Sequence, residues 1–101
     1  MANHYFLTVT TSGANITTGA ASTSIGIPVC SSGEIPTFIR VASTNDCYVK
    51  MGVGSATASA NDLLIQPADS AVLSVPRGVT HIAAIQNSAA GKVSIVPLEF
   101  V

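Results

Sequence analysis

The longest regular strand pattern in this chain is Val79-Thr80-His81-Ile82-Ala83-Ala84-Ile85-Gln86. Side chains alternate between two faces along an extended chain, so Ile82 and Ile85 fall on opposite sides. Turn residues bound the segment, with Pro76-Arg77-Gly78 before it and Asn87-Ser88-Ala89-Ala90-Gly91 after it. A period of two between two turn signals predicts a β-strand.

The same period recurs on both sides of this strand in short apolar runs that turn residues separate. No segment repeats its apolar residues at the 3.6-residue spacing of a helix. The pattern therefore predicts an all-β fold, either a small antiparallel β-sandwich that is jelly-roll-like or a barrel, and periodicity does not decide between them. The further runs expected to be strands are residues 37–42, 47–51, 62–67, 71–76 and 92–100.

Two of these runs lie next to each other around Ser43-Thr44-Asn45-Asp46, which predicts a hairpin between residues 37–42 and 47–51. Because Trp is absent and aromatic residues make up only 5% of the chain, aliphatic side chains must fill most of the core. The side chains expected to be mostly buried are Phe38, Val41, Val49, Leu64, Val72, Ile82, Ile85, Val93 and Ile95.

The first third of the single expected domain, residues 1–101, has a different composition. Residues 1–33 contain Ser, Thr, Gly and Ala stretches with weak propensity for any regular structure. Strands are possible at residues 6–10 and 24–29. We expect residues 1–33 to form a less regular N-terminal arm or edge region, whose order depends on a neighbouring molecule.

Charged residues make up 9% of the chain, whereas a soluble domain carries about 25%. The net charge is −1 and the four Lys and Arg residues are scattered, which argues against nucleic acid as a partner. No apolar stretch is long enough for a membrane span, so no membrane partner is expected. The first residues lack the pattern of a secretory signal, so we expect synthesis in a cytoplasm.

Few residues suggest chemistry. His4, His81, Cys30 and Cys47 are of the types that bind zinc, but they lack the paired spacing of zinc ligands. A reducing cytoplasm favours two free thiols over a disulfide, although one bridge between the cysteines stays possible. His81 and the many serines could be combined into a catalytic triad only by coincidence, because no nucleophile-elbow motif is present. We expect no catalytic residues, no metal and no cofactor, and hence no enzyme.

Five segments between about residue 38 and residue 99 carry a common pattern of strands and turns. They are Arg40-Val41-Ala42, Asp46-Cys47-Tyr48-Val49-Lys50-Met51-Gly52, Asp62-Leu63-Leu64, Val75-Pro76-Arg77-Gly78-Val79-Thr80-His81-Ile82-Ala83 and Gly91-Lys92-Val93-Ser94-Ile95. In these segments the chain resembles small structural proteins of tailed bacteriophage virions, often capsid cement or decoration proteins.

That resemblance implies a β-sandwich located on the virion and made in the host cytoplasm. Its partners would be the major capsid protein and other virion proteins, and it would stabilise the shell by bridging major capsid protein subunits. The alternative is a neck, tail or fibre module that serves as an adaptor or for attachment. Copy number in the particle separates these two interpretations.

Sparse charge and an apolar excess predict that the chain associates with other copies of itself, as a trimer or a dimer. The two chain ends are the expected interface, because they are apolar and would otherwise be exposed. An arm of this kind can dock by adding a strand to a sheet edge. Deletion of residues 2–9 should then leave a folded sandwich that no longer assembles. The expected interface residues are Ala2, Asn3, His4, Tyr5, Phe6, Leu7, Leu98, Phe100 and Val101.

Overall fold

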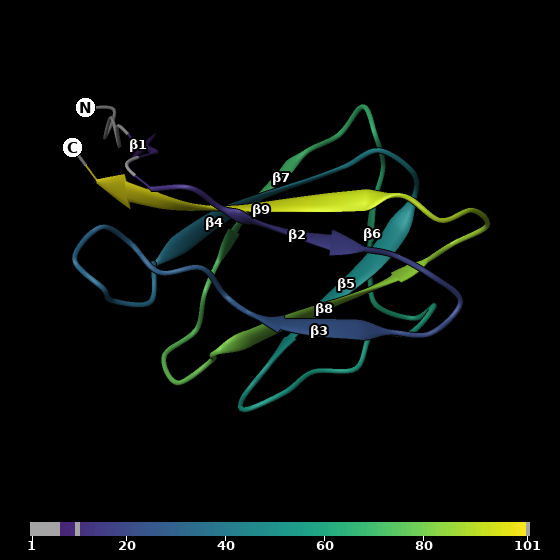
Figure 1. Cartoon of the computed structure of the whole chain (residues 1–101), viewed down its shortest axis with the longest axis horizontal. Helices are drawn as coiled ribbons and strands as arrows, with labels where there is room; N and C mark the ends of the chain where they lie inside the picture. The colour runs from purple at the N-terminus through teal and green to yellow at the C-terminus, as the bar shows by residue number, and fades with distance from the viewer. Residues whose placement is uncertain (1–6, 10, 101) are drawn as a thin grey trace, which may run out of the picture.

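A computed structural model describes residues 7–9 and 11–100 of the chain. Within these residues the chain forms strands and no helix, and the strands lie in two stacked antiparallel sheets (Figure 1). The strands are β1 (Leu7–Thr8), β2 (Ala14–Thr17), β3 (Thr23–Gly26), β4 (Phe38–Ser43), β5 (Cys47–Gly52), β6 (Leu63–Ile65), β7 (Ala71–Ser74), β8 (His81–Gln86) and β9 (Lys92–Phe100).

The predicted β-sandwich is confirmed, and the barrel alternative is wrong because both sheets keep open edges. The first sheet has the order β1-β9-β4-β7, and β2 also pairs with β9. The second sheet has the order β3-β8-β5-β6. The pairs β2·β9, β3·β8, β4·β7 and β5·β6 are nested within one another along the chain. A long antiparallel ribbon rolled up in this way is the jelly-roll arrangement.

The expected hairpin between β4 and β5 is wrong. β4 pairs with β7 and β9 in the first sheet, whereas β5 pairs with β6 and β8 in the second. Residues 44–46 therefore carry the chain from one sheet to the other. Alternation along each strand is the same whichever sheet it joins, so the local pattern could not identify the pairing partner.

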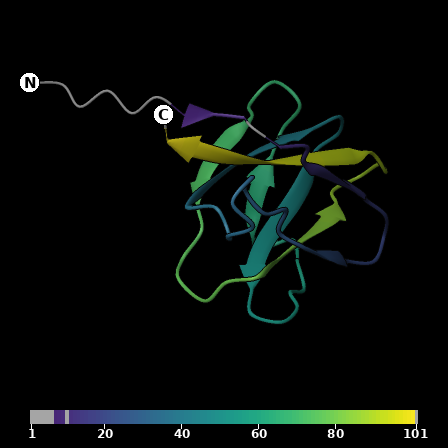
Figure 2. The same ribbon diagram turned by 60° about the vertical axis from the view of Figure 1, so that its left-hand side comes forward.

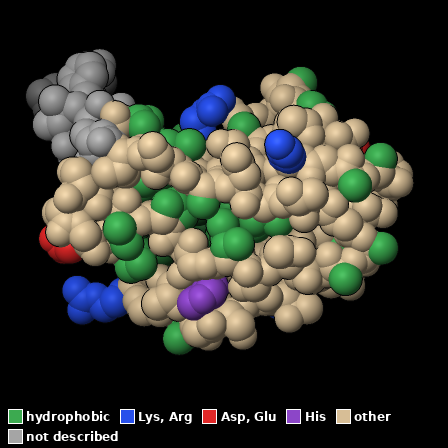
Figure 3. Space-filling model, viewed as in Figure 1, with side chains coloured by type: hydrophobic (Ala, Val, Ile, Leu, Met, Phe, Trp, Pro, Cys, Tyr) green, Lys and Arg blue, Asp and Glu red, His purple; other side chains and the backbone are tan. Residues whose placement is uncertain are grey.

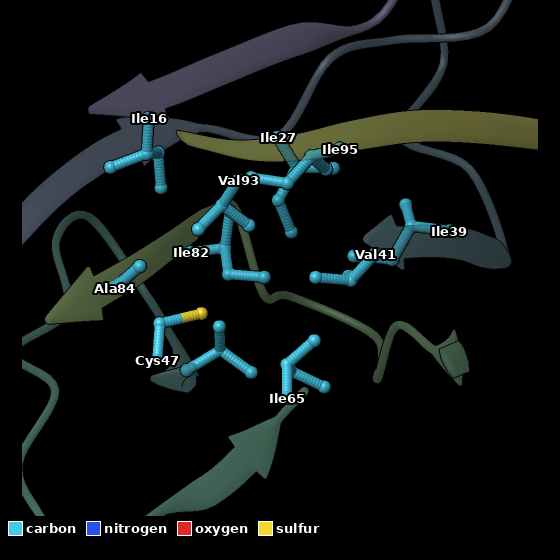
Figure 4. Packing of buried hydrophobic residues seen from close by; sticks show 11 residues of the cluster. Ile16, Ile27, Ile39, Val41, Cys47, Ile65, Ile82, Ala84, Val93 and Ile95 are labelled. Atoms are coloured by element: carbon cyan, nitrogen blue, oxygen red, sulfur yellow. The ribbon is translucent and has the colours of Figure 1, made fainter. Parts of the chain in front are cut away.

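The core lies between the sheets and consists almost entirely of β-branched side chains, which point toward one another in Figure 4. Val41, Ile82, Val93 and Ile95 are fully buried, and Val49 is nearly so, as predicted. The buried cluster comprises Ile16, Ile27, Ile39, Val41, Cys47, Val49, Ile65, Ile82, Ala84, Val93 and Ile95.

Four expected core residues are less buried than predicted. Phe38 and Ile85 are only partly buried. Leu64 and Val72 are exposed to 39% and 53%, so their prediction as core residues is wrong. Each lies next to an apolar residue that takes the inward position instead, Ile65 in β6 and Leu73 in β7. Strand alternation allows only one of two adjacent apolar side chains to face the core.

Two edge strands, β2 and β3, come from the segment that was expected to be irregular. The strand β2 is not apparent from the sequence, yet it pairs with β9 over four residues, and Ile16 within it is 1% exposed. A Cβ at Gly13 would collide with the backbone carbonyl oxygen of Ile95, so the chain can approach β9 this closely only with glycine at position 13. β1 and β2 are thus two parts of one broken edge strand that runs along β9.

The loops divide between the two ends of the sandwich (Figures 1 and 2). One end carries the β2–β3, β4–β5, β6–β7 and β8–β9 connections. The other end carries β1, the C-terminal end of β9, and the β3–β4 and β7–β8 connections. We call this second end the terminal end. No helix that the structure describes is long and apolar enough to cross a membrane.

Candidate functional site: an apolar sheet face and an end cleft

The described residues contain no cluster of three or more His, Cys, Asp or Glu side chains that could hold a metal ion. Of the four residues considered as zinc ligands, His4 lies outside the described residues. Cys30 and Cys47 are both buried and are not joined by a disulfide. Burial raises the pKa of the Cys47 thiol above its ordinary value. A side-chain hydrogen bond with Ser43 lowers this pKa, and the nearby Asp46 charge raises it, so the net change is upward. A thiol held in its neutral form is a poor nucleophile and a poor metal ligand.

His81 begins β8 on the outward side of the second sheet. Its Nδ1 lies 2.8 Å from the Thr80 hydroxyl, which also accepts a hydrogen bond of 2.9 Å from the Gly54 N–H. The cross-strand partners of His81 are two glycines, Gly26 and Gly52. Asp46 is at the opposite end of β5 from Gly52, and so it is not placed to orient the His81 ring.

A strap formed by residues 54–58 covers part of the outer face of the second sheet. Alternate backbone N–H groups of the strap donate to outward hydroxyls of the sandwich: Gly54 to Thr80, Ala56 to Ser24 at 3.2 Å, and Ala58 to Ser22 at 2.9 Å. Ala83, the register partner of Ser24, is fully buried although it occupies an outward position. The strap explains that burial, because it crosses the sheet at Ser24.

On the outer face of the first sheet, Arg40 and Val72 are exposed. Ile39 and Val41 point into the core, so Arg40 between them points outward. The register places Arg40 between Val72 of β7 and Val96 of β9. The Arg40 guanidinium donates a hydrogen bond of 3.0 Å to the Ser70 hydroxyl, and the Arg40 side chain is exposed.

The outward positions of this face are apolar, neutral polar or positively charged. Lys92 alternates with the inward Val93, so it lies on the same outer face as Arg40. Among the outward strand positions whose side chains the structure describes, none carries a carboxylate. We call this surface the Arg40 face. Its outward residues are Asn15, Thr17, Phe38, Arg40, Ala42, Val72, Ser74, Lys92, Ser94, Val96 and Leu98.

Exposed apolar side chains also occur elsewhere. Figure 3 shows a band of hydrophobic side chains across the middle of the side between β2 and β3, with charged side chains few and far apart. The large hydrophobic residues that are exposed, among those described, are Val9, Val29, Ile35, Val53, Leu63, Leu64 and Val72. Single exposed apolar residues are ordinary on a protein surface, but with so little charge around them they favour association.

The terminal end contains an open cleft of about 630 Å³ between the β3–β4 and β7–β8 connections. A second hollow of about 240 Å³ adjoins it and is lined by Cys30, Ser32 and Leu98 as well as by four residues that also line the cleft. The two hollows share part of their lining, and the smaller one reaches Leu98 of β9. We call the two together the end cleft; its larger part is lined by Glu34, Ile35, Pro36, Thr37, Val75, Pro76, Arg77, Gly78, Val79 and Thr80.

The structure places only some of the predicted interface residues. Ala2, Asn3, His4, Tyr5, Phe6 and Val101 lie outside the described residues. The backbone of Leu7 pairs with that of Phe100, so the two chain ends do meet along one sheet edge. Leu98 is 8% exposed and therefore offers little surface to a partner. Sequence reasoning missed the end cleft, because its two walls come from loops about 40 residues apart.

Protein-family models, curated proteins and solved structures were compared with the chain, and none of them matches it.

Proposed function

We propose that this chain is a non-enzymatic structural subunit of a bacteriophage virion, a cement or decoration protein that binds major capsid protein subunits across their junctions. One observation carries the proposal most directly. The outer face of the second sheet is partly covered by the chain's own strap, whereas on the Arg40 face Arg40 is exposed and the neighbouring Val72 is 53% exposed.

The Arg40 face has the composition of a docking surface. Arg40 lies between two valines, and arginine in an apolar setting is favoured where proteins bind each other. With Arg40 and Lys92 as its only charges at the described positions, the face is complementary to an apolar surface that carries carboxylates. The proposed partner is therefore a shell surface that is apolar and carries carboxylates.

Binding of this kind would stabilise a shell by mass action. A protein that binds only the assembled shell lowers the free energy of that state, and its contribution grows with occupancy. A rigid sandwich loses little conformational freedom on docking, so more of its binding free energy is retained. No catalytic group is required for this function.

Co-sedimentation with shells that lack the protein tests the proposal. Arg40→Glu reverses the central charge of the Arg40 face, and Lys50→Glu makes the same change at an exposed position on the second sheet. We expect wild-type and Lys50→Glu proteins to bind the shells and to raise the temperature at which they break. Arg40→Glu should bind at least about tenfold more weakly.

Equal binding by the two charge-reversal variants would refute the Arg40 face as the docking surface. Absence of binding by the wild-type protein to shells, with binding to isolated necks, tails or fibres instead, would favour the adaptor function over the cement function.

A further inference from the structure

The edge of β7 is a second surface of the first sheet, distinct from its outer face. Within the described residues β7 ends the strand order and pairs only with β4. We propose that this edge pairs antiparallel with the same edge of a second copy, so that the first sheets of the two copies form one continuous sheet. This pairing goes beyond the proposed function and does not depend on it.

Two residues of β7 direct their backbone hydrogen-bonding groups toward this edge. The Val75 N–H donates to the Thr37 carbonyl oxygen at 2.8 Å, so Val75 is bonded to the chain beside β4. Hydrogen-bonded and non-hydrogen-bonded pairs alternate along an antiparallel ladder, so Leu73 is bonded to β4 in the same way. Val72 and Ser74 therefore turn their N–H and C=O groups away from β4, where an added strand can bind them.

This edge lacks the features that usually prevent such pairing. Edge strands are commonly protected by charged side chains, by proline or by a bulge. Residues 70–75 have the sequence Ser-Ala-Val-Leu-Ser-Val, which contains neither a charge nor a proline. Val72 is 53% exposed, and Ser74 is exposed as well. The opposite edge of the same sheet is interrupted between β1 and β2, which makes it a poorer template for strand addition.

A two-fold axis perpendicular to the sheet at Leu73 satisfies the backbone groups of both copies. Leu73 of one copy then lies opposite Leu73 of the other in a non-hydrogen-bonded pair, which covers side chains that are only partly buried in one copy. Val72 of each copy lies opposite Ser74 of the other, and each such pair exchanges both of its N–H···O=C bonds. The Pro76 nitrogen carries no hydrogen, so the ladder ends there.

The charges at the ends of this ladder are complementary in the same register. Asp69 and Arg77 lie equally far from Leu73 along the chain, so Asp69 of one copy falls opposite Arg77 of the other. Both side chains are exposed, and the two-fold axis repeats the contact at the second end. An axis at Val72 would also pair the backbones, but it would place Asp69 opposite Val75. The charges therefore favour the Leu73 axis and a second copy as the occupant of the edge.

The pairing also places the Arg40 faces of the two copies side by side. An axis perpendicular to the sheet keeps both outer faces on the same side, with the strand order β9-β4-β7-β7-β4-β9 across the dimer. A dimer of this kind has one continuous outer surface with an Arg40 in each half.

Self-association of charge variants tests the proposal. Asp69→Arg and Arg77→Asp each bring like charges together at both ends of the ladder, so each variant should dimerise at least about tenfold more weakly than the wild type. An equimolar mixture of the two variants brings opposite charges together at both ends and should dimerise about as strongly as the wild type. Sedimentation equilibrium measures all of these proteins, and circular dichroism checks that they are folded.

Lys50→Asp is the matched control, because it changes an exposed charge on the second sheet and should leave dimerisation unchanged. A monomeric wild-type protein, unchanged dimerisation of both charge variants, or a mixture that associates no better than either variant alone would overturn the proposal.

Cysteine crosslinking tests the register. In a mixture of Val72→Cys and Ser74→Cys proteins, the new thiols lie on directly opposite residues with Cα atoms about 5.5 Å apart, a separation that allows a disulfide. We expect mild oxidation to form the mixed dimer faster than either homodimer, as measured by intact mass spectrometry. The wild-type protein is the control, because its Cys30 and Cys47 are buried. Fastest formation of the Val72→Cys homodimer would indicate an axis at Val72 and overturn the proposed pairing.

These measurements contain no shells, so their outcome is independent of the proposed function. If the charge variants dimerise like the wild type while Arg40→Glu still loses shell binding, the edge pairing alone fails. If the mixture restores dimerisation but no shell is bound, the edge pairing stands and the cement function fails.

Discussion

Thr18 and Gly91 lie 73 positions apart in the chain and hold each other through reciprocal hydrogen bonds. The Thr18 N–H donates to the Gly91 carbonyl oxygen at 2.8 Å, and the Gly91 N–H donates to the Thr18 hydroxyl at 2.8 Å. Thr18 is 3% exposed. This pair joins the β2–β3 connection to the β8–β9 connection and so closes the end of the sandwich opposite the terminal end.

Replacing Thr18 with valine keeps the shape of the side chain but removes the acceptor of the Gly91 N–H. A buried donor without a partner costs about 1–3 kcal/mol, so we expect the free energy of unfolding to fall by that amount. The adjacent Thr17, the last residue of β2, is exposed, and Thr17→Val serves as the control with little change. Urea denaturation measures both. Equal stability of the two variants would show that water replaces the Thr18 hydroxyl.

Gly13→Ala should destabilise the edge formed by β1 and β2. The added Cβ would collide with the carbonyl oxygen of Ile95, and backbone atoms there cannot move without disturbing β9. Overpacking of this kind costs about 1–3 kcal/mol. At Gly26 an added Cβ would meet open space, so Gly26→Ala should change the free energy of unfolding by less than about 0.5 kcal/mol. Thermal denaturation that ranks the two variants in the opposite order would contradict the close approach at Gly13.

The two faces of β8 should respond differently to truncation. Ile82 is fully buried between the sheets, and Ile82→Ala should cost about 2–5 kcal/mol. Ile85 lies on the outward side and is only partly buried, so Ile85→Ala should cost less, about 1–2 kcal/mol. Chemical denaturation gives both values. A larger loss at Ile85 than at Ile82 would mean that β8 is turned over relative to the structure.

Stability should decrease in alkaline solution because of Cys47. Burial raises the pKa of the folded thiol above its ordinary value of 9.0. Above that pH the unfolded chain loses the thiol proton while the folded chain keeps it, so the unfolded state gains stability. The contribution is fully present below pH 9 and decreases as the pH rises from there toward the folded pKa.

The matched variant for this prediction is Cys47→Ala. Its free energy of unfolding is lower throughout because of the cavity, but it should fall less steeply with pH between 8 and 10.5. The difference in slope approaches about 1.4 kcal/mol per pH unit once the unfolded thiol is ionised. Parallel curves for the wild-type and variant proteins would contradict the raised pKa.

Sequence patterns were enough to predict the strands of the last two thirds, because each is a short alternating run between turn residues. They did not reveal β2, where Ile16 is the only large apolar residue. They placed Leu64 and Val72 in the core because each neighbours another apolar residue, and the choice between two adjacent positions depends on the register of the whole sheet.

The sequence composition pointed to association, but it did not identify the surfaces involved. The Arg40 face becomes visible only once β4, β7 and β9 are known to be neighbours in one sheet. The end cleft is formed by residues 34–37 and 75–80, whose proximity follows from the nested strand pairing. The chain ends were predicted to be an interface, and the pairing of Leu7 with Phe100 brings them together without testing that prediction.

The number of copies of this chain in purified virions tests its assignment as a cement protein most directly. Quantitative mass spectrometry can compare its amount with that of the major capsid protein in the same particles. The proposed function predicts a fixed ratio that corresponds to hundreds of copies per particle, on the order of the number of capsid subunit junctions. About a dozen copies or fewer, or none, would contradict it.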